Sequence, residues 1–293
     1  MLGFVNLDKP SGWTSHDCVA RVRRILKTKR VGHGGTLDPM ATGVLPIAVG
    51  NATRLLSYLP DKKAYRARIR FGMTTNTDDI EGEVIRSNPC PDLCLKTVET
   101  YLPRFSGSIE QIPPMFSAIQ KDGKRLYELA RKGEIIEVPP RIVEIYGITV
   151  LGWTEGEFPE LEVSIECGGG TYIRSIARDL GDLVGVGGTL AGLIRTRSCG
   201  MELSDSITLE TLAAADIHEI LLPPRVALQG LEFLRLSPES SIDWFHGRKI
   251  ALEGGEKGAF RAIESEDGKF LGIGQIAGDD ESCYLQPKVV LAE

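Results

Sequence analysis

Hydrophobic and polar positions alternate most regularly at residues 63–71, KAYRARIRF. The apolar positions are Tyr65, Ala67, Ile69 and Phe71, and the basic ones are Arg66, Arg68 and Arg70. A period of two residues predicts a half-buried strand with one apolar and one cationic face. The same alternation at residues 161–167 predicts a second strand.

Apolar positions spaced by three and four residues predict two helices. One helix has Ser15 as its N-cap and runs to about Lys27. Its apolar face carries Val19, Val22 and Leu26, and its other faces carry Arg21, Arg23, Arg24 and Lys27. The second helix spans about residues 171–184.

The order of these elements predicts the fold class. Further strands are expected at residues 3–7, 44–49 and 190–196. Strands and helices follow one another irregularly, which favours an α+β (mixed α/β) fold over a doubly wound sheet. Beyond about Leu231, short strand-like runs separated by Gly and Asp indicate a small β-barrel. We therefore expect a large domain over residues 1–230 and a small one over residues 231–293.

The composition is that of an ordinary soluble protein. Of the 293 residues, 42% are hydrophobic and 25% charged, and no apolar stretch is long enough to span a membrane. The start, MLGFVNLDKP, lacks the features of a signal peptide. The six cysteines are scattered, and no His or second Cys pair completes a zinc site with Cys90 and Cys94. These features predict a cytoplasmic protein with free thiols.

Charge is distributed unevenly along the chain. The net charge is −6 at pH 7, which by itself argues against a nucleic-acid partner. Residues 1–70 nevertheless hold thirteen Lys and Arg against four Asp and Glu, a balance of +9, whereas residues 231–293 hold seven against twelve, a balance of −5. Such asymmetry predicts an RNA-facing surface near the N-terminus, although a solvated helix face is the simpler explanation of any single basic run.

Three glycine-rich runs fail as nucleotide-binding motifs. Residues 32–36 lack the Gly-Lys-Ser/Thr ending of a phosphate loop, and Leu37 stands where GxGxxG requires its last glycine. The runs that begin at Gly168 and Gly185 carry neither pattern. The four histidines have no metal-binding spacing, and no GxSxG elbow is present. We therefore expect no metal and no cofactor.

An aspartate remains in the glycine-rich loop GHGGTLDPMATG at residues 32–43. Asp38 precedes a proline, which favours extended backbone, and the glycines let a substrate approach closely. A carboxylate in such a loop suits a nucleophile or a base. The simpler explanation is an Asp that forms a turn by bonding its own backbone, and taken alone these residues favour the turn.

Five segments across residues 3–200 form an ordered set of motifs. The most specific is VGHGGTLDPMATGVLP. The others are NLDKPSGWTSHD, KAYRARIRFGMTTNTDDIEGEV, IEQIPPMFSAIQKDGKRLYELARKG and CGGGTYIRSIARDLGDLVGVGGTLAGLIRTRSCG. In their order along the chain, the five segments resemble the TruB family of tRNA pseudouridine synthases. The resemblance implies a pseudouridine-synthase core on a mixed, largely antiparallel sheet, an RNA-gripping insertion at about residues 108–145, and a C-terminal PUA-like RNA-binding barrel.

The resemblance also implies roles for individual residues. Asp38 would be the catalytic aspartate, Tyr65 would stack on the target uracil, and Arg174 would pair with Asp38 and keep it ionised. The residues that would lie in the RNA-binding cleft or line the base pocket are His33, Tyr172 and Leu193. Without the order of the five segments, core or surface packing would explain these side chains more simply.

The reaction that the resemblance implies is isomerisation of uridine 55 in the TΨC loop of tRNA. We expect a cytoplasmic monomer that binds the TΨC stem-loop, with neither a guide RNA nor a membrane as partner. The first motif begins almost at residue 1 and no long basic tail follows, which favours a stand-alone enzyme over a guide-RNA-dependent synthase. An RNA-folding protein without catalysis and a glycosyl-bond hydrolase are less favoured, since Asp38, Tyr65 and Arg174 occur together and Asp38 lacks the partner carboxylate of a hydrolase.

Overall fold

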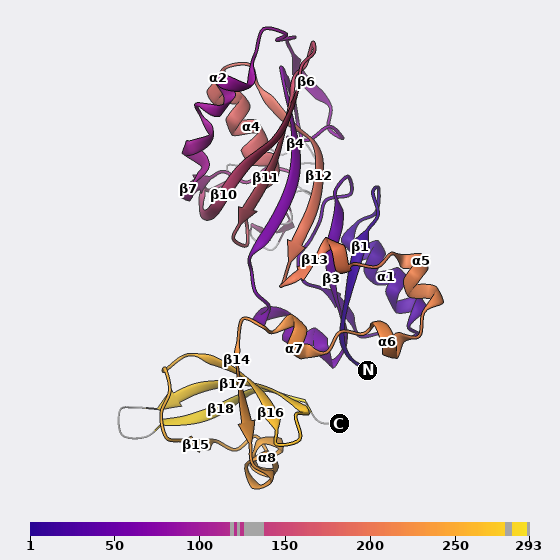
Figure 1. The fold of residues 1–293 in the computed structure, drawn as a ribbon, viewed down its shortest axis with the longest axis vertical. Helices are drawn as coiled ribbons and strands as arrows, with labels where there is room; N and C mark the ends of the chain where they lie inside the picture. The colour runs from indigo at the N-terminus through magenta and orange to yellow at the C-terminus, as the bar shows by residue number, and fades with distance from the viewer. Residues whose placement is uncertain (118–119, 122–123, 126–137, 279–282, 292–293) are drawn as a thin grey trace.

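The computed structural model describes residues 1–117, 120–121, 124–125, 138–278 and 283–291. The molecule is elongated, with a large sheet at one end and a smaller sheet at the other (Figure 1). Within the expected insertion at about residues 108–145, residues 118–119, 122–123 and 126–137 lie outside the described residues. No helix in the described part of the chain has the length and apolar character needed to cross a membrane.

The larger sheet has nine strands. They are β1 (Leu2–Lys9), β2 (Val31–His33), β3 (Thr42–Gly50), β4 (Lys63–Phe71), β7 (Gly107–Gln111), β10 (Arg141–Thr154), β11 (Glu160–Cys167), β12 (Gly188–Ser198) and β13 (Met201–Glu202). The main path runs β1-β3-β12-β4-β11-β10-β7, with β2 beside β3 and β13 beside β12. Between these described strands, β12 and β3 pair in parallel and the other pairings are antiparallel. The predicted mixed, largely antiparallel sheet is confirmed.

Strand β4 has the predicted alternation, and its three arginines lie on one face, where acids of a neighbouring strand offset much of their charge. Its apolar positions are buried in a core with β11, β12 and helix α4 (Ile173–Val184). On the opposite face, Arg66 Nε lies 2.6 Å from a carboxylate oxygen of Glu162, and Arg68 Nε lies 3.0 Å from one of Glu160. Two glutamates of the neighbouring strand β11 thus offset most of the charge of the three arginines, which the sequence of β4 alone could not reveal.

Helix α1 (Ser15–Ile25) is capped by Thr14, so the prediction of Ser15 as N-cap is wrong. The Thr14 hydroxyl accepts a hydrogen bond from Asp17 N at 3.1 Å, and the Asp17 carboxylate accepts one from Thr14 N at 3.0 Å. This reciprocal capping box pairs Asp17 with the residue three positions before it. The Ser15 hydroxyl is therefore free to bond elsewhere.

The smaller sheet is the predicted C-terminal barrel, curled into a half-barrel (Figure 1). Its strands, in spatial order, are β14 (Glu232–Leu236), β16 (Phe260–Ser265), β17 (Phe270–Gly278), β18 (Cys283–Val290) and β15 (Ile250–Leu252). The two sheets share a hydrophobic cluster, to which Phe4 and Ala48 contribute from the larger sheet and Ala262, Ile273 and Val289 from the smaller. Burial of this cluster holds the two parts of the chain together.

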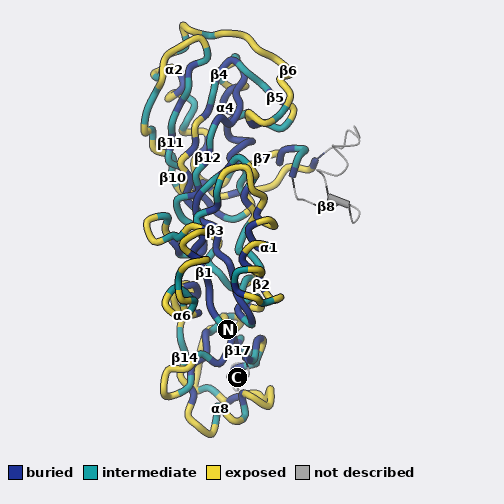
Figure 2. The backbone as a smooth tube through the Cα atoms, turned by 90° about the vertical axis from the view of Figure 1, so that its right-hand side faces the viewer, coloured by how far each residue is buried: buried dark blue, intermediate teal, exposed yellow. Residues whose placement is uncertain are grey.

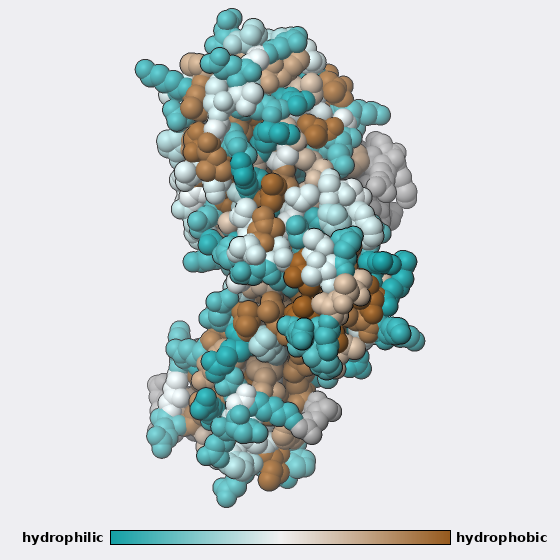
Figure 3. Space-filling view, turned by 45° about the vertical axis from the view of Figure 1, so that its right-hand side comes forward, coloured by the Kyte–Doolittle hydropathy of each residue, from teal (hydrophilic) through white to brown (hydrophobic). Residues whose placement is uncertain are grey.

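Short elements connect these layers. They are β5 (Met73–Thr75), β6 (Val84–Ser87), β8 (Gln120–Lys121), β9 (Lys124–Arg125), η1 (Asn51–Tyr58), η2 (Leu102–Phe105), η3 (Leu203–Asp205), α2 (Leu95–Glu99), α5 (Leu209–Ala214), α6 (Ile217–Ile220), α7 (Pro224–Ala227) and α8 (Pro238–Phe245). Buried backbone follows the central strands, and exposed backbone follows the loops at the ends (Figure 2). On the face seen in Figure 3, hydrophilic side chains predominate, and hydrophobic ones appear near the middle of the molecule and in its upper part.

Candidate active site

A cavity of about 1020 Å³ opens beside the loop that carries Asp38. Its walls come from the start of α1, the Asp38 loop, strands β4 and β12 and the start of α4. Five of the residues predicted for the site line it: Asp38, Tyr65, Tyr172, Arg174 and Leu193. The volume is at the upper end of the ~300–1,000 Å³ typical of ligand pockets, so it can enclose a nucleobase.

Asp38 and Arg174 form an ion pair at the wall of this cavity. Arg174 Nη2 donates a hydrogen bond to Asp38 Oδ1 at 3.1 Å, and Nε lies 2.9 Å from Oδ2. The second contact is one of charge, because the Nε–H makes no hydrogen bond. The Arg174 side chain is 5% exposed and that of Asp38 is 32% exposed. The guanidinium is therefore enclosed, whereas the carboxylate remains accessible from the cavity.

The position of Arg174 is electrostatically unusual. It lies in the first turn of α4, where the helix dipole disfavours a cation. Besides Asp38, a second carboxylate offsets this: Asp79 Oδ2 lies 3.7 Å from Arg174 Nη1. Arg174 also donates to the carbonyls of Thr77 and Phe116, at 3.1 and 3.0 Å. Nothing in the sequence singles out Asp79, because one Asp in the polar run at residues 74–83 carries no distinguishing pattern.

Opposing effects act on the Asp38 carboxyl. Burial raises the pKa of Asp38 above its ordinary value, Arg174 lowers it, and the charge of Asp79 raises it further. About a third of the side-chain surface is exposed, but the protein around the carboxyl removes enough hydration for burial to outweigh the ion pair. The result is a carboxylate that takes up a proton more readily than an exposed Asp, a property that suits proton-transfer chemistry.

The loop around Asp38 is held by buried polar side chains. The Ser15 hydroxyl accepts a hydrogen bond from Leu37 N at 2.8 Å and donates one to Leu37 O at 3.2 Å. Lys9 is fully buried, donates to Pro39 O at 3.1 Å, and has a pKa lowered by burial. The residues on both sides of Asp38 are thus fixed, which pre-organises its carboxylate.

A second buried cation, Arg195, holds the same loop from strand β12. It donates to the carbonyls of Gly35 at 3.1 Å, Thr36 at 3.2 Å and Val44 at 2.7 Å. Arg195 is fully buried and forms no ion pair with a described residue. In the sheet, Arg195 of β12 lies opposite Tyr65 of β4. The same residue therefore holds the Asp38 loop through its side chain and pairs with the strand that carries the aromatic wall of the cavity.

Tyr65 is 6% exposed and forms part of the cavity wall from β4. Burial raises the pKa of its phenol, and Arg195 acts in the opposite direction. Leu193, on β12, lines the same cavity. An aromatic ring and an aliphatic side chain beside the Asp38–Arg174 pair give the cavity an apolar side.

Tyr172 is the N-cap of α4 and is held by Gln111 at the end of β7. Gln111 accepts a hydrogen bond from Tyr172 N at 2.8 Å and donates one to Tyr172 O at 3.0 Å. Burial raises the pKa of the Tyr172 phenol. Gln111 thereby positions the helix that carries Arg174, a role that a lone Gln does not signal in the sequence.

His33 is the predicted site residue that does not line the cavity. Its ring lies edge-on to that of His16, with the centroids 5.5 Å apart, and His16 does line the cavity. Burial lowers the pKa of His33, and His16 acts in the same direction. The position of His16 at the start of α1, beside Ser15, is the feature of the sequence that indicates its place at the cavity.

The described residues contain no group of three or more His, Cys, Asp or Glu arranged to hold a metal ion. The lining includes one accessible carboxylate, one enclosed guanidinium and two phenols, of Asp38, Arg174, Tyr65 and Tyr172, and further ionisable side chains of His16, Lys63, Asp79 and Glu81. Together they can move protons or add a carboxylate to an electrophilic carbon next to an aromatic surface.

Comparison with known sequences identifies matches over most of the chain. Residues 23–173 match the family model described as TruB family pseudouridylate synthase (N terminal domain), and residues 234–291 match Pseudouridine synthase II TruB, C-terminal. The tRNA pseudouridine synthase B of Microcystis aeruginosa is 62% identical over 295 residues, which cover 100% of both chains. That of Synechocystis sp. is 53% identical, with 99% of this chain and 100% of the relative covered.

Solved structures share the fold. The crystal structure of a Cbf5-Nop10-Gar1 complex matches with a TM-score of 0.76 and 26% identity, covering 98% of this chain and 84% of the matched one. A structure of an H/ACA RNP bound to a substrate RNA containing 2'-deoxyuridine matches with a TM-score of 0.76 and 24% identity, covering 99% and 85%. The expected pseudouridine-synthase core with a PUA-like C-terminal part is confirmed.

Proposed function

The chain belongs to the TruB family of pseudouridine synthases, and from this we propose that Asp38 is its catalytic aspartate, with Tyr65 and Arg174 as catalytic partners. The reaction is the isomerisation of uridine to pseudouridine in tRNA. One observation carries the assignment: an enclosed guanidinium holds the accessible Asp38 carboxylate at the wall of the cavity that Tyr65 also lines.

The isomerisation of uridine needs few chemical groups besides these. The bond from ribose C1′ to uracil N1 breaks, the base turns, and C1′ joins C5; C5 loses a proton and N1 gains one. The Asp38 carboxylate can act by adding to the base, by adding to the ribose or by removing a ribose proton. Each route uses the ionised form, which the positive charge of Arg174 favours.

The cavity also suits a base taken out of an RNA stack. Flipping a nucleotide costs a few kcal/mol, and stacking on an aromatic side chain returns about 1–3 kcal/mol. We propose that Tyr65 supplies the stacking surface and that Tyr172 and Leu193 complete the pocket. His33 would act on the RNA through His16, whose ring it contacts.

We propose uridine 55 of the TΨC loop as the target, modified by a cytoplasmic monomer without a guide RNA. The relatives at 53% and 62% identity are named tRNA pseudouridine synthase B, which supports tRNA itself as the partner. We also propose a catalytic domain at residues 1–230, an RNA-gripping insertion at about 108–145, and an RNA-binding domain at residues 231–293. Strand β14, the first of the smaller sheet, begins at Glu232.

The substitution Asp38→Asn tests the catalytic assignment. Asn keeps the size and turn-forming ability of Asp but removes the charge and the nucleophilic oxygen. Under single-turnover conditions, tritium release from C5-labelled uridine in an unmodified tRNA transcript should fall by several orders of magnitude, with tRNA affinity almost unchanged. Substantial release by the folded variant would overturn the assignment. Chemical mapping of the wild-type product, without guide RNA, tests position 55.

A further inference from the structure

A second cavity, of about 590 Å³, borders the same segment of chain as the catalytic cavity. Pro10, Trp13 and Asp17 line the second cavity, whereas Ser15 and His16 line the catalytic one. We propose that this second cavity is an RNA subsite, where Trp13 stacks on an unpaired or terminal base of the tRNA and Arg21 and Arg24 bind the adjoining phosphates. The inference rests on the proposed function, because it assumes that tRNA occupies the catalytic cavity.

The Trp13 ring is accessible and its backbone is fixed. Its exposed fraction is 38%, whereas Trp244 is fully buried. The indole N–H of Trp13 makes no hydrogen bond with a described residue, while that of Trp244 donates to Leu271 O at 3.1 Å. Lys9 Nζ donates to the Trp13 carbonyl at 2.5 Å. With its backbone fixed, a Trp has only two side-chain torsions to lose when a base stacks on its ring, so the entropy cost is small.

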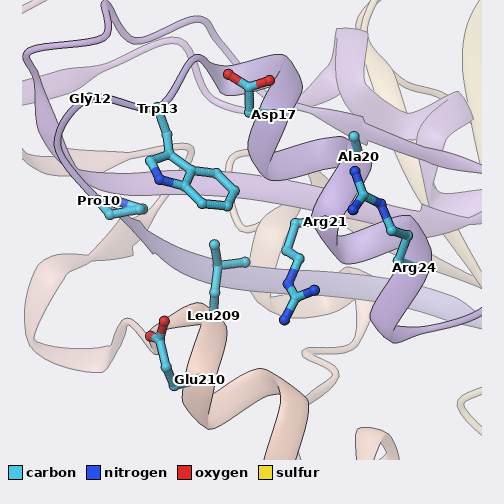
Figure 4. A pocket seen from close by; sticks show the side chains of 9 residues that line it. All are labelled: Pro10, Gly12, Trp13, Asp17, Ala20, Arg21, Arg24, Leu209 and Glu210. Carbon is cyan, nitrogen blue, oxygen red and sulfur yellow. The ribbon is translucent and has the colours of Figure 1, made fainter.

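Two cations beside the ring lie beyond ion-pair distance of any described carboxylate. Arg21 and Arg24 are exposed and lie three residues apart on α1. The charge of Arg21 does act on Glu210, whose pKa it helps to lower, but the two side chains form no close pair. The carboxylate of Asp17 points away from the indole and is engaged by Thr14 (Figure 4). Both guanidinium groups are therefore available for an anion.

The combination favours a nucleotide over other ligands. A flat aromatic surface selects a planar ring, and guanidinium forks select phosphate oxygens. Residues 10–17 border both cavities, so one tRNA bound at the catalytic cavity has a neighbouring segment close to Trp13. One group opposes the interaction: Glu210 of α5 lies at the edge of the cavity (Figure 4). Its negative charge should weaken phosphate binding.

Substitution of the ring gives the main test. Trp13→Ala should weaken binding of an unmodified tRNA transcript by about 5- to 100-fold, whereas Trp13→Phe, which keeps a ring, should lose much less. Wild-type fluorescence should be quenched by tRNA, and most of that quenching should disappear in Trp13→Phe. Ile85→Ala is the control, because Ile85 is 70% exposed on β6 and lines neither cavity. Equal affinity for wild type and Trp13→Ala would overturn the subsite.

Substitution of the charges gives an independent test. Arg21→Gln with Arg24→Gln should lower the slope of log affinity against log salt by about 2, one for each lost phosphate contact. Glu210→Gln should strengthen binding. The double control Lys96→Gln with Arg104→Gln removes the same charge near α2 and should leave the slope unchanged. An unchanged slope in the α1 variant would also overturn the proposal.

The rate at saturating enzyme separates this inference from the proposed function. Single-turnover conversion by Trp13→Ala should match the wild type once all tRNA is bound, because Trp13 does not line the catalytic cavity. If the wild-type protein fails to convert uridine in tRNA, the proposed function is wrong. If it converts uridine but the Trp13 and arginine variants bind normally, only the subsite is wrong. If Trp13→Ala does not fold, the loss of fluorescence quenching in Trp13→Phe and the stronger binding of Glu210→Gln still test the subsite.

Discussion

The Asp38–Arg174 and Arg66–Glu162 pairs join the same chemical groups in different surroundings. The Nε–oxygen distances are 2.9 Å in the first pair and 2.6 Å in the second. Arg174 is 5% exposed, however, and Arg66 is 53% exposed. Burial raises the pKa of Asp38, whereas hydrogen bonding to Arg66 lowers that of Glu162. Hydration, rather than contact with arginine, decides whether the carboxylate resembles a reactive group or an ordinary surface acid.

The difference in burial between the two pairs also determines how much each contributes to stability. An exposed ion pair contributes about 0–1 kcal/mol to stability, because water screens it and the side chains lose freedom. Removal of one partner from a buried pair costs about 3–5 kcal/mol, because the other charge is left without compensation. The pair at the cavity is therefore the one whose disruption should be visible in function.

The largest effect is expected for Arg174→Gln. Loss of the cation leaves Asp38 and Asp79 facing each other without compensation. If a penalty of about 3–5 kcal/mol is felt at the transition state, the single-turnover rate falls by about 10²- to 10⁴-fold. Arg174→Lys should recover part of the rate, because it restores the charge without the planar fork. Tritium release from labelled tRNA measures both.

Arg66→Gln is the matched control for that substitution. It removes the same group from an exposed pair on strand β4, so the rate should stay within about twofold of wild type. Equal losses in the two variants, with both proteins folded by circular dichroism, would show that burial does not separate the pairs.

A smaller effect is expected on pH dependence. The charge of Asp79 helps to raise the pKa of Asp38 above its ordinary value of 3.8. The single-turnover rate should fall on the acid side as Asp38 takes up a proton. Asp79→Asn removes the charge, which lowers the pKa of Asp38, so the midpoint of this acid limb should move to lower pH.

Asp78→Asn controls for the loss of a neighbouring acid. Asp78 pairs with Arg178 at 2.9 Å and does not influence Asp38 comparably. Rate profiles of wild type and both variants, measured from about pH 4 to 8 around the ordinary carboxyl range, decide the issue. If the midpoint of the acid limb stays at the same pH or moves to higher pH in Asp79→Asn, the charge of Asp79 does not raise the pKa of Asp38.

The contributions of the Arg66–Glu162 and Asp38–Arg174 pairs to the free energy of unfolding should respond differently to ionic strength. The free energy of unfolding of Arg66→Gln should differ from wild type by less than about 1 kcal/mol in low salt. That difference should vanish in about 1 M NaCl, because exposed charges are screened. The deficit of Arg174→Gln should largely persist, since Arg174 and its second partner Asp79 are enclosed. Urea denaturation at the two salt concentrations measures this, and a deficit of Arg174→Gln that disappears in salt would argue against enclosure.

Local patterns in the sequence predicted the strands but not their electrostatics. The alternation of β4 follows from the chain itself, so its buried face could be read directly. The neutralisation of its arginines depends on the register of β11, which places Glu160 opposite Arg70 and Glu162 opposite Arg68. The balance of +9 over residues 1–70 therefore combined paired cations on β4 with unpaired cations on α1.

The candidate site was predictable to the same limited degree. Asp38, Tyr65 and Arg174 could be proposed because each lies in a segment that resembles a known family. The residues that hold these groups, among them Lys9, Asp79 and Gln111, come from separate segments and meet only in the folded chain. Their roles consist of bonds to backbone or to another side chain, which no spacing in the sequence records.

The smallest effect is expected when the paired arginines of β4 are set free. Glu160→Gln with Glu162→Gln would leave Arg66, Arg68 and Arg70 without their carboxylates. Freed cations strengthen RNA binding only where the RNA passes, and alternation places these arginines on the opposite face of β4 from Tyr65. Affinity for unmodified tRNA should therefore stay within about twofold of wild type, with the same salt slope. Filter binding across a salt series measures both, with Arg21→Gln and Arg24→Gln as the variant that should change them. A several-fold gain in affinity would mean that the RNA also contacts the face of the sheet that carries these arginines. In that case the glutamates of β11 weaken RNA binding at this face.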